Sequence, residues 1–395
     1  MLILQPNFNT RIQELLECIN NETFFVSDWN KENEILDFNM NKFQIQNEYH
    51  KEKNTYFFSD EFQKLKKEYA PSVLYNNKYR YISPSYFSIV SNCTIASFLS
   101  LYYVNKHIKK VNALILAPTY FSYIRVLQDM NANIHYIECY NSNDKTIVDE
   151  INYNIVTNSI NIIIATEPLF GTGVSLSKKL FNEVNNICNQ NGVYFLIDYT
   201  YGGMKWEECN CEQDSFFMSL ISSKYTILIE SICKRVFLNG IKHGIVIASP
   251  EIINEIEEIS VYVAGCLSEQ QILLYKQLYN IDNRKYLIET INTNNVHYKN
   301  NFELIKSLLI NTDFDMSACN CGYFCLIGIP KDNKNTNFSI AKNILSTTNI
   351  LTIPHDRYIF NCINNYYFRV NLAISQEKLI QAFQSILKAY PNGIY

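Results

Sequence analysis

A block of short apolar runs between residues 191 and 248 constrains the fold of this chain more than any other feature. The runs at 193–197, 225–229 and 245–248 are rich in Ile, Leu and Val, and each is bounded by polar or turn-forming residues. Short β-branched runs with such boundaries predict buried strands. We therefore expect strands whose ends carry the polar residues of the block.

Comparable runs at 113–117, 133–137 and 162–166 predict further strands. Ahead of the 193–197 run, apolar residues at helical spacing over 180–188 predict a helix, and Gly192 is suited to end it. Strand–helix–strand units with short connections favour parallel strands joined by right-handed crossovers. The sequence thus predicts an α/β fold.

Length and charge narrow the class of protein. The chain has 395 residues, enough for two domains. Its net charge of -4 and pI near 5.9 indicate no basic surface for nucleic acid or an anionic membrane. No apolar stretch reaches bilayer length, and the first residues lack the pattern of a secretory signal. We therefore expect a cytoplasmic protein without a nucleic-acid or membrane partner.

The chain has 12 cysteines, which without a secretory signal predict reduced thiols rather than a disulfide framework. The close pairs Cys209/Cys211 and Cys319/Cys321 lack the spacing and the paired histidines of a zinc site. Cys325 falls in a strand-like run, where cysteine behaves as a small buried hydrophobe. No metal site is expected.

Four residues whose side chains can take part in catalysis or binding follow the predicted strands of the central block: Asp198, Tyr201, Ser231 and Lys234. Open α/β sheets bind ligands beyond the carboxyl ends of their strands. An acid, a tyrosine, a serine and a lysine placed there suggest a lysine Schiff base with a pyridine cofactor.

Together with the segment 240–244, Gly-Ile-Lys-His-Gly, these residues resemble the core motif of the class I and II aminotransferases. Those enzymes use pyridoxal phosphate (PLP), have fold type I and include aspartate aminotransferase. Their pattern is a strand ending in Asp, a Tyr three residues on, Ser-x-x-Lys, and Gly-Leu-Arg-x-Gly. The order and spacing of the motif agree throughout this stretch.

The resemblance extends over roughly residues 56–390. It implies a large domain with a mostly parallel seven-stranded sheet flanked by helices, and a smaller α+β domain. The domains expected are an N-terminal arm or part of the small domain at 1–55, a PLP-binding domain at 56–284, and a C-terminal small domain at 285–395. It also implies a homodimer.

The resemblance assigns roles to the core residues. Lys234 would be catalytic, first holding PLP as a Schiff base and then acting as a general base on the substrate α-proton. Asp198 would bind the protonated pyridine nitrogen, and Tyr201 would donate to the ring oxygen. Ser231 and Lys242 would hold the phosphate.

Further positions correspond outside the core. Tyr120 follows a strand and a proline and would stack on the cofactor ring. The amides of Cys93 and Thr94, at a strand-to-helix turn, would bind the phosphate. Tyr56 would reach the phosphate of a neighbouring subunit. Arg369 would grip the substrate α-carboxylate with its planar fork.

Among the positions that depart from the family pattern, three concern the cofactor site. Phe170 replaces an Asn that would bind the cofactor ring oxygen, and a phenyl ring cannot do so. Cys93 replaces a glycine. Lys242 replaces an arginine, so a guanidinium that can donate two parallel hydrogen bonds is exchanged for the point charge of an ammonium group.

The implied function is a PLP-dependent transferase, an aminotransferase acting on an α-amino acid and a 2-oxo acid. Two alternatives remain open. One is a PLP-dependent lyase or cyclase on the same scaffold, with which Phe170 and Cys93 would be compatible. The other is a non-catalytic relative that kept the fold, against which the set Asp198, Lys234 and Arg369 argues.

Overall fold

The computed structural model describes residues 13–30, 63, 66–67, 72–75, 78–206, 220, 222–240, 242–265, 267–332, 334–358, 360 and 362–394. The bounds given below refer to this part of the chain. Tyr56, predicted to contact a neighbouring cofactor phosphate, lies outside it.

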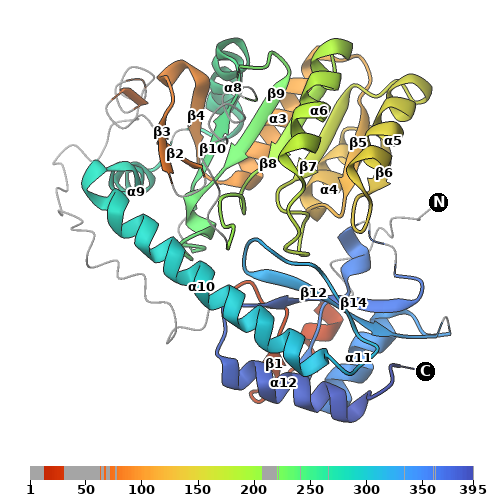
Figure 1. The fold of residues 1–395 in the computed structure, drawn as a ribbon. Helices are drawn as coiled ribbons and strands as arrows, with labels where there is room; N and C mark the ends of the chain where they lie inside the picture. The colour runs from red at the N-terminus through yellow and green to blue at the C-terminus, as the bar shows by residue number, and fades with distance from the viewer. Residues whose placement is uncertain are drawn as a thin grey trace.

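A main sheet dominates the upper half of the molecule (Figure 1). Among the described residues seven strands form it, in the order β4-β10-β9-β8-β7-β5-β6. Only β10 runs antiparallel to its neighbours, which confirms the mostly parallel seven-stranded sheet. The strands are β4 Phe87–Val90, β5 Asn112–Ala117, β6 Asn133–Glu138, β7 Ile162–Thr166, β8 Tyr194–Asp198, β9 Thr226–Glu230 and β10 Gly244–Ile247.

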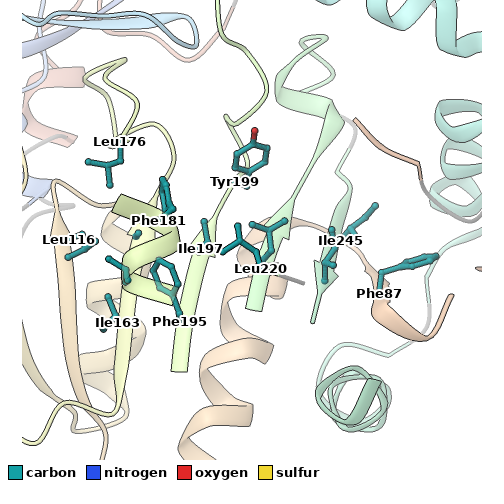
Figure 2. Packing of buried hydrophobic residues seen from close by; sticks show 14 of the residues in the cluster. Phe87, Leu116, Ile163, Leu176, Phe181, Phe195, Ile197, Tyr199, Leu220 and Ile245 are labelled. Carbon is teal, nitrogen blue, oxygen red and sulfur yellow. The ribbon is translucent and has the colours of Figure 1, made fainter. Parts of the chain in front are cut away.

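Helices cover both faces of this sheet. Because side chains alternate along a strand, Leu114 and Leu116 of β5 join one core, whereas Ala113 and Ile115 join the other. Figure 2 shows the first core, where Phe181 of α6 lies near Phe195 of β8. That face carries α5 Asp144–Thr157, α6 Lys178–Asn191 and α9 Glu269–Tyr279, and the other carries α3 Cys93–His107, α4 Phe121–Asp129 and α8 Pro250–Val263.

A smaller antiparallel sheet with its own core lies below the main sheet (Figure 1). Its order is β11-β12-β14, and the helices α11 and α12 pack against it. A short strand, β1, pairs in parallel with β13. The bounds are β1 Phe24–Phe25, β11 Asp315–Met316, β12 Phe324–Pro330, β13 Ile350–Leu351, β14 Asn365–Asn371, α11 Asn337–Thr348 and α12 Gln376–Ala389.

The remaining elements are short, except for the helix α10, Arg284–Leu309, which joins the two cores. Leu287 and Ile291 near its start belong to a main-sheet core, while Tyr298 and Phe302 belong to the small-sheet core. The short elements are the hairpin β2 Ser72–Tyr75 and β3 Lys78–Tyr81, and the 3-10 turns η2 Pro84–Tyr86, η3 Ile232–Lys234, η4 Ile281–Asn283 and η5 His355–Tyr358.

The predicted strands of the main sheet occur where expected, with ends shifted by at most one residue. The helix α3 begins at Cys93, where the Asn92 side chain caps its first turn. In the described part of the chain, no helix is long and apolar enough to cross a bilayer.

Gly244, the first residue of β10, passes very close to the start of α3. A Cβ added there would lie 2.7 Å from the carbonyl carbon of Asn92 and 2.9 Å from the nitrogen of Cys93. Both are backbone atoms that cannot rotate away, so only glycine allows β10 to approach the helix N-terminus this closely.

We predict that Gly244→Ala lowers the free energy of unfolding by about 1–3 kcal/mol, because the added methyl forces the two backbones apart. Urea unfolding followed by circular dichroism measures this. Gly240→Ala is the matched control, since nothing lies within 4 Å of its Cβ position. Equal stability of the two variants would contradict the close approach.

Candidate active site

Several of the predicted site residues lie where β8 and β9 end, on the side of the main sheet that faces the small sheet. The Lys234 Nζ lies 5.8 Å from the ring centroid of Trp29 and 5.8 Å from that of Tyr201. The same Trp29 ring stacks on Arg369, with its centroid 3.4 Å from the guanidinium carbon. The structure therefore brings Lys234, Tyr201 and Arg369 together around one indole.

The Lys234 amine is unusually easy to deprotonate. Burial, assisted by the nearby cation of Lys242, lowers its pKa from 10.5 to about 8. At pH 7 about one such amine in ten is neutral, whereas an ordinary lysine is almost wholly charged. Lys234 thus has a chemically useful population of nucleophilic amine.

Asp198 ends β8 with both carboxylate oxygens engaged. Its Oδ1 accepts from the Thr200 N–H at 3.0 Å, and its Oδ2 accepts from the Tyr123 hydroxyl at 3.0 Å. The Ser97 hydroxyl lies 2.9 Å from the Tyr123 oxygen. Burial raises the pKa of Asp198, while the hydrogen bonds from Thr200 and Tyr123 and the charge of Lys234 oppose that rise. These contacts favour a carboxylate, the form that can bind a cationic ring.

The N-terminus of α3 and the loop before β10 lie side by side. The Asn92 side chain accepts the Ile95 N–H, which leaves the amides of Cys93 and Thr94 as the outward donors of the first turn. The Cys93 side chain is half-buried and that of Thr94 is exposed. Burial raises the pKa of the Cys93 thiol to about 12, so it stays neutral.

Ser231 and Lys242 border the same turn. The Ser231 hydroxyl is buried and donates to the carbonyl of His243 at 2.9 Å, so in this structure it holds the loop in place. The Lys242 side chain is exposed, yet its charge affects the pKa of Lys234. A helix N-terminus beside a lysine is suited to a phosphate group.

Arg369 lies on β14 and is almost wholly buried, with 1% of its surface exposed. Its Nε and Nη2 both donate to the carbonyl of Ser27 at 3.1 Å, and Nη1 donates to the Tyr358 hydroxyl at 3.2 Å. The rings of Trp29 and Phe324 pack against the guanidinium. These contacts fix the plane of the Arg369 guanidinium, and further N–H groups of Nη1 and Nη2 can donate to a bound anion.

Tyr120 and Phe170 form an aromatic wall of the site. Their ring centroids lie 5.3 Å apart, and the Phe170 ring is also 4.7 Å from Tyr358 and 5.8 Å from Trp29. The Phe170 side chain therefore fills its position by packing and offers no hydrogen bond there.

Three residues at the site were not expected from the sequence: Trp29, Tyr123 and Tyr358. Tyr123 could have been expected from the sequence, because it lies one helical turn after Tyr120. Trp29 is one of only 2 tryptophans, but nothing near it in the sequence indicated contact with a residue 340 positions away.

Residues 32–386 match the family described as aminotransferase class I and II. An aspartate aminotransferase from Pyrococcus horikoshii is 23% identical over 235 residues, which are 59% of this chain and 58% of that protein. The alignment thus spans less than two thirds of that relative's length.

Solved structures agree with the fold. The aromatic aminotransferase from Pyrococcus horikoshii superposes with a TM-score of 0.74 at 16% identity, covering 96% of this chain and 99% of that one. The aspartate aminotransferase from Rhizobium meliloti gives a TM-score of 0.74 at 13% identity, covering 98% and 95%. These likenesses show fold type I. Because the family match covers most of its length, the chain belongs to the class I and II aminotransferases, a family of PLP-dependent transferases.

Proposed function

We propose that this protein is an aminotransferase that moves an amino group between an α-amino acid and a 2-oxo acid, with PLP held on Lys234 as a Schiff base. The observation that carries the proposal is the approach of Lys234 and Arg369 to one Trp29 ring. A readily neutralised amine and an oriented guanidinium, placed this close, suit the amino and carboxylate ends of an amino acid.

The residues present fit PLP. The Asp198 carboxylate, supported by Tyr123, offers a buried anion for the ring nitrogen. The amides of Cys93 and Thr94 with the Lys242 cation suit the phosphate, and Ser231 would join them if its hydroxyl turned from the His243 carbonyl. When bound, the cofactor would supply an electron sink for charge that develops on the substrate.

The protein's own groups then have separate tasks. Lys234 would move a proton at the substrate α-carbon, and Arg369 would orient the α-carboxylate. Tyr201 would donate to the cofactor ring oxygen; burial raises the pKa of its hydroxyl, which keeps it protonated as a donor requires. Tyr120 would stack on the ring. Tyr56 of the partner subunit would complete the phosphate site.

A homodimer is part of this proposal. Val261, Tyr262 and Val263 end α8 with exposed fractions of 68%, 63% and 40%, an apolar patch suited to burial against a second copy. We also propose the boundaries 1–55, 56–284 and 285–395 for the arm and the two domains. The cytoplasmic location stays a prediction.

A second candidate function follows from Phe170. Its packed ring leaves Tyr201 as the proposed donor to the cofactor ring oxygen, which changes how strongly that oxygen is held. Such a change would be compatible with a PLP-dependent lyase or cyclase acting on an amino acid. A spectral half-reaction with an amino acid, reversed by a 2-oxo acid, would favour the aminotransferase; product release without it would favour the second candidate.

We predict that the purified protein takes up PLP with a visible absorbance band that Lys234→Ala abolishes, because the covalent attachment is lost. Absorbance spectra and mass spectrometry after borohydride reduction measure this. Lys179→Ala, on the exposed side of α6, is the control and should keep the band. Absence of PLP uptake by the unaltered protein would leave a non-catalytic relative of the fold.

The lowered pKa of Lys234 predicts a pH dependence. The rate at which phosphate-free pyridoxal attaches to the apoprotein should rise with pH and reach half of its maximum near pH 8, where the amine loses its proton. Lys242→Gln removes a cation that disfavours the charged amine, so its profile should move to higher pH. An unchanged profile in Lys242→Gln would contradict this coupling. Stopped-flow absorbance gives the rates.

Tyr123→Phe should weaken PLP binding by about tenfold or more, because a hydrogen bond to a carboxylate contributes roughly 1.5–3 kcal/mol. Equilibrium titration of the apoprotein with PLP gives the dissociation constant. Tyr153→Phe is the control, since that side chain is 67% exposed on α5. The same affinity in both variants would show that Tyr123 does not support Asp198.

A further inference from the structure

A buried pair of opposite charges lies immediately outside the residues assigned so far. Glu230 is the last residue of β9, and Arg235 directly follows the 3-10 turn Ile232–Lys234. Arg235 Nη2 lies 2.9 Å from Glu230 Oε1, and the two side chains are 0% and 1% exposed. The pair therefore spans the turn that carries Ser231 and Lys234.

Stability alone gives no reason for this pair. Removing two charges from water costs about as much as their attraction returns, and apolar residues of similar volume often stabilise a core better. The cost is visible here, because burial raises the pKa of Glu230 although the Arg235 charge opposes the rise. The rest of β9 consists of Thr and branched apolar residues, so an apolar pair would fit the surrounding core.

The contacts of the pair fix the geometry of the turn. The Arg235 N–H donates to the Ile232 carbonyl at 3.0 Å, and the Arg235 carbonyl accepts from Asn294 of α10 at 3.3 Å. Its guanidinium lies 5.8 Å from the ring centroid of Tyr199, the neighbour of Asp198. The Arg235 side chain thus joins the turn to β9 and to the end of β8, and the Arg235 backbone joins it to α10.

We propose that Glu230 and Arg235 are positioning residues, an ion pair that sets the turn so that Lys234 and Ser231 reach the cofactor aldehyde and phosphate. This inference rests on the proposed function. The Lys234 amine lies 5.8 Å from the ring centroids of Trp29 and Tyr201, whereas the Arg235 guanidinium contacts Glu230. The pair acts through the backbone between its members, where small displacements change reaction rates strongly.

The test compares the unaltered protein with the double variant Glu230→Gln/Arg235→Met, which removes both charges and leaves neither one buried alone. Two quantities are measured on each apoprotein: the urea midpoint of unfolding, and the rate and affinity of PLP attachment followed by absorbance. Positioning predicts a midpoint close to that of the unaltered protein, with attachment at least tenfold slower and affinity at least tenfold weaker. A structural pair would change the midpoint and leave attachment unchanged.

Two further variants keep the test decisive. Arg235→Lys retains the cation but loses the planar fork, so it tests the geometry even if the double variant does not fold; a severalfold slower attachment is expected. Glu257→Gln breaks the ion pair with Lys66, 2.6 Å long and remote from the turn, and should leave attachment unchanged.

The outcomes separate the two proposals. Failure of the unaltered protein to take up PLP would overturn both. Normal uptake by the unaltered protein, with equal rates in the folded double variant and in Arg235→Lys, would overturn the positioning pair alone. Slower attachment in Glu257→Gln to the same extent would also overturn it, because the effect would then follow from the loss of any ion pair.

Discussion

The structure depends on one constraint: both faces of the central strands of the main sheet are buried, so charged groups of these strands can lie only where the strands end. An ion placed within such a sheet would lose its hydration without gaining a partner. Asp198 and Glu230 accordingly occupy the last positions of β8 and β9, and each has partners at hand, Tyr123 and Thr200 for the first and Arg235 for the second. The edge that collects these groups faces the small sheet, which contributes Arg369.

Much of this arrangement follows from sequence because its causes are local. Runs of branched apolar residues define the strands, and an acid or serine after most of these runs marks the end of the strand. The turn after β9 could likewise be predicted with its lysine, since the Ser-x-x-Lys spacing is a local pattern. The positions of Asp198, Tyr201 and Lys234 near one another needed only the parallel pairing of β8 with β9.

What could not be predicted depends on distant segments. Trp29 reaches Arg369 because β1 pairs with β13 and the Ser27 hydroxyl donates to the Arg369 carbonyl, contacts that join the two ends of the chain. Glu230 and Arg235 are close in sequence, but their burial as a pair could not be predicted, since hydropathy alone would place both charged side chains in water. The sequence identifies Phe170 as a departure from the family pattern, but its packing against Tyr120, Tyr358 and Trp29 is visible only in the structure.

The long helix α10 has a mechanical consequence. At 1.5 Å per residue its 26 residues extend about 39 Å. The first half of the helix packs in a main-sheet core and the second half in the small-sheet core, so one continuous helix connects the two sheets. A rotation of the small sheet relative to the main sheet would therefore tilt or bend α10. Because Arg369 lies in the small sheet and Lys234 beside the main sheet, such a change in α10 would alter the distance between the guanidinium and the amine.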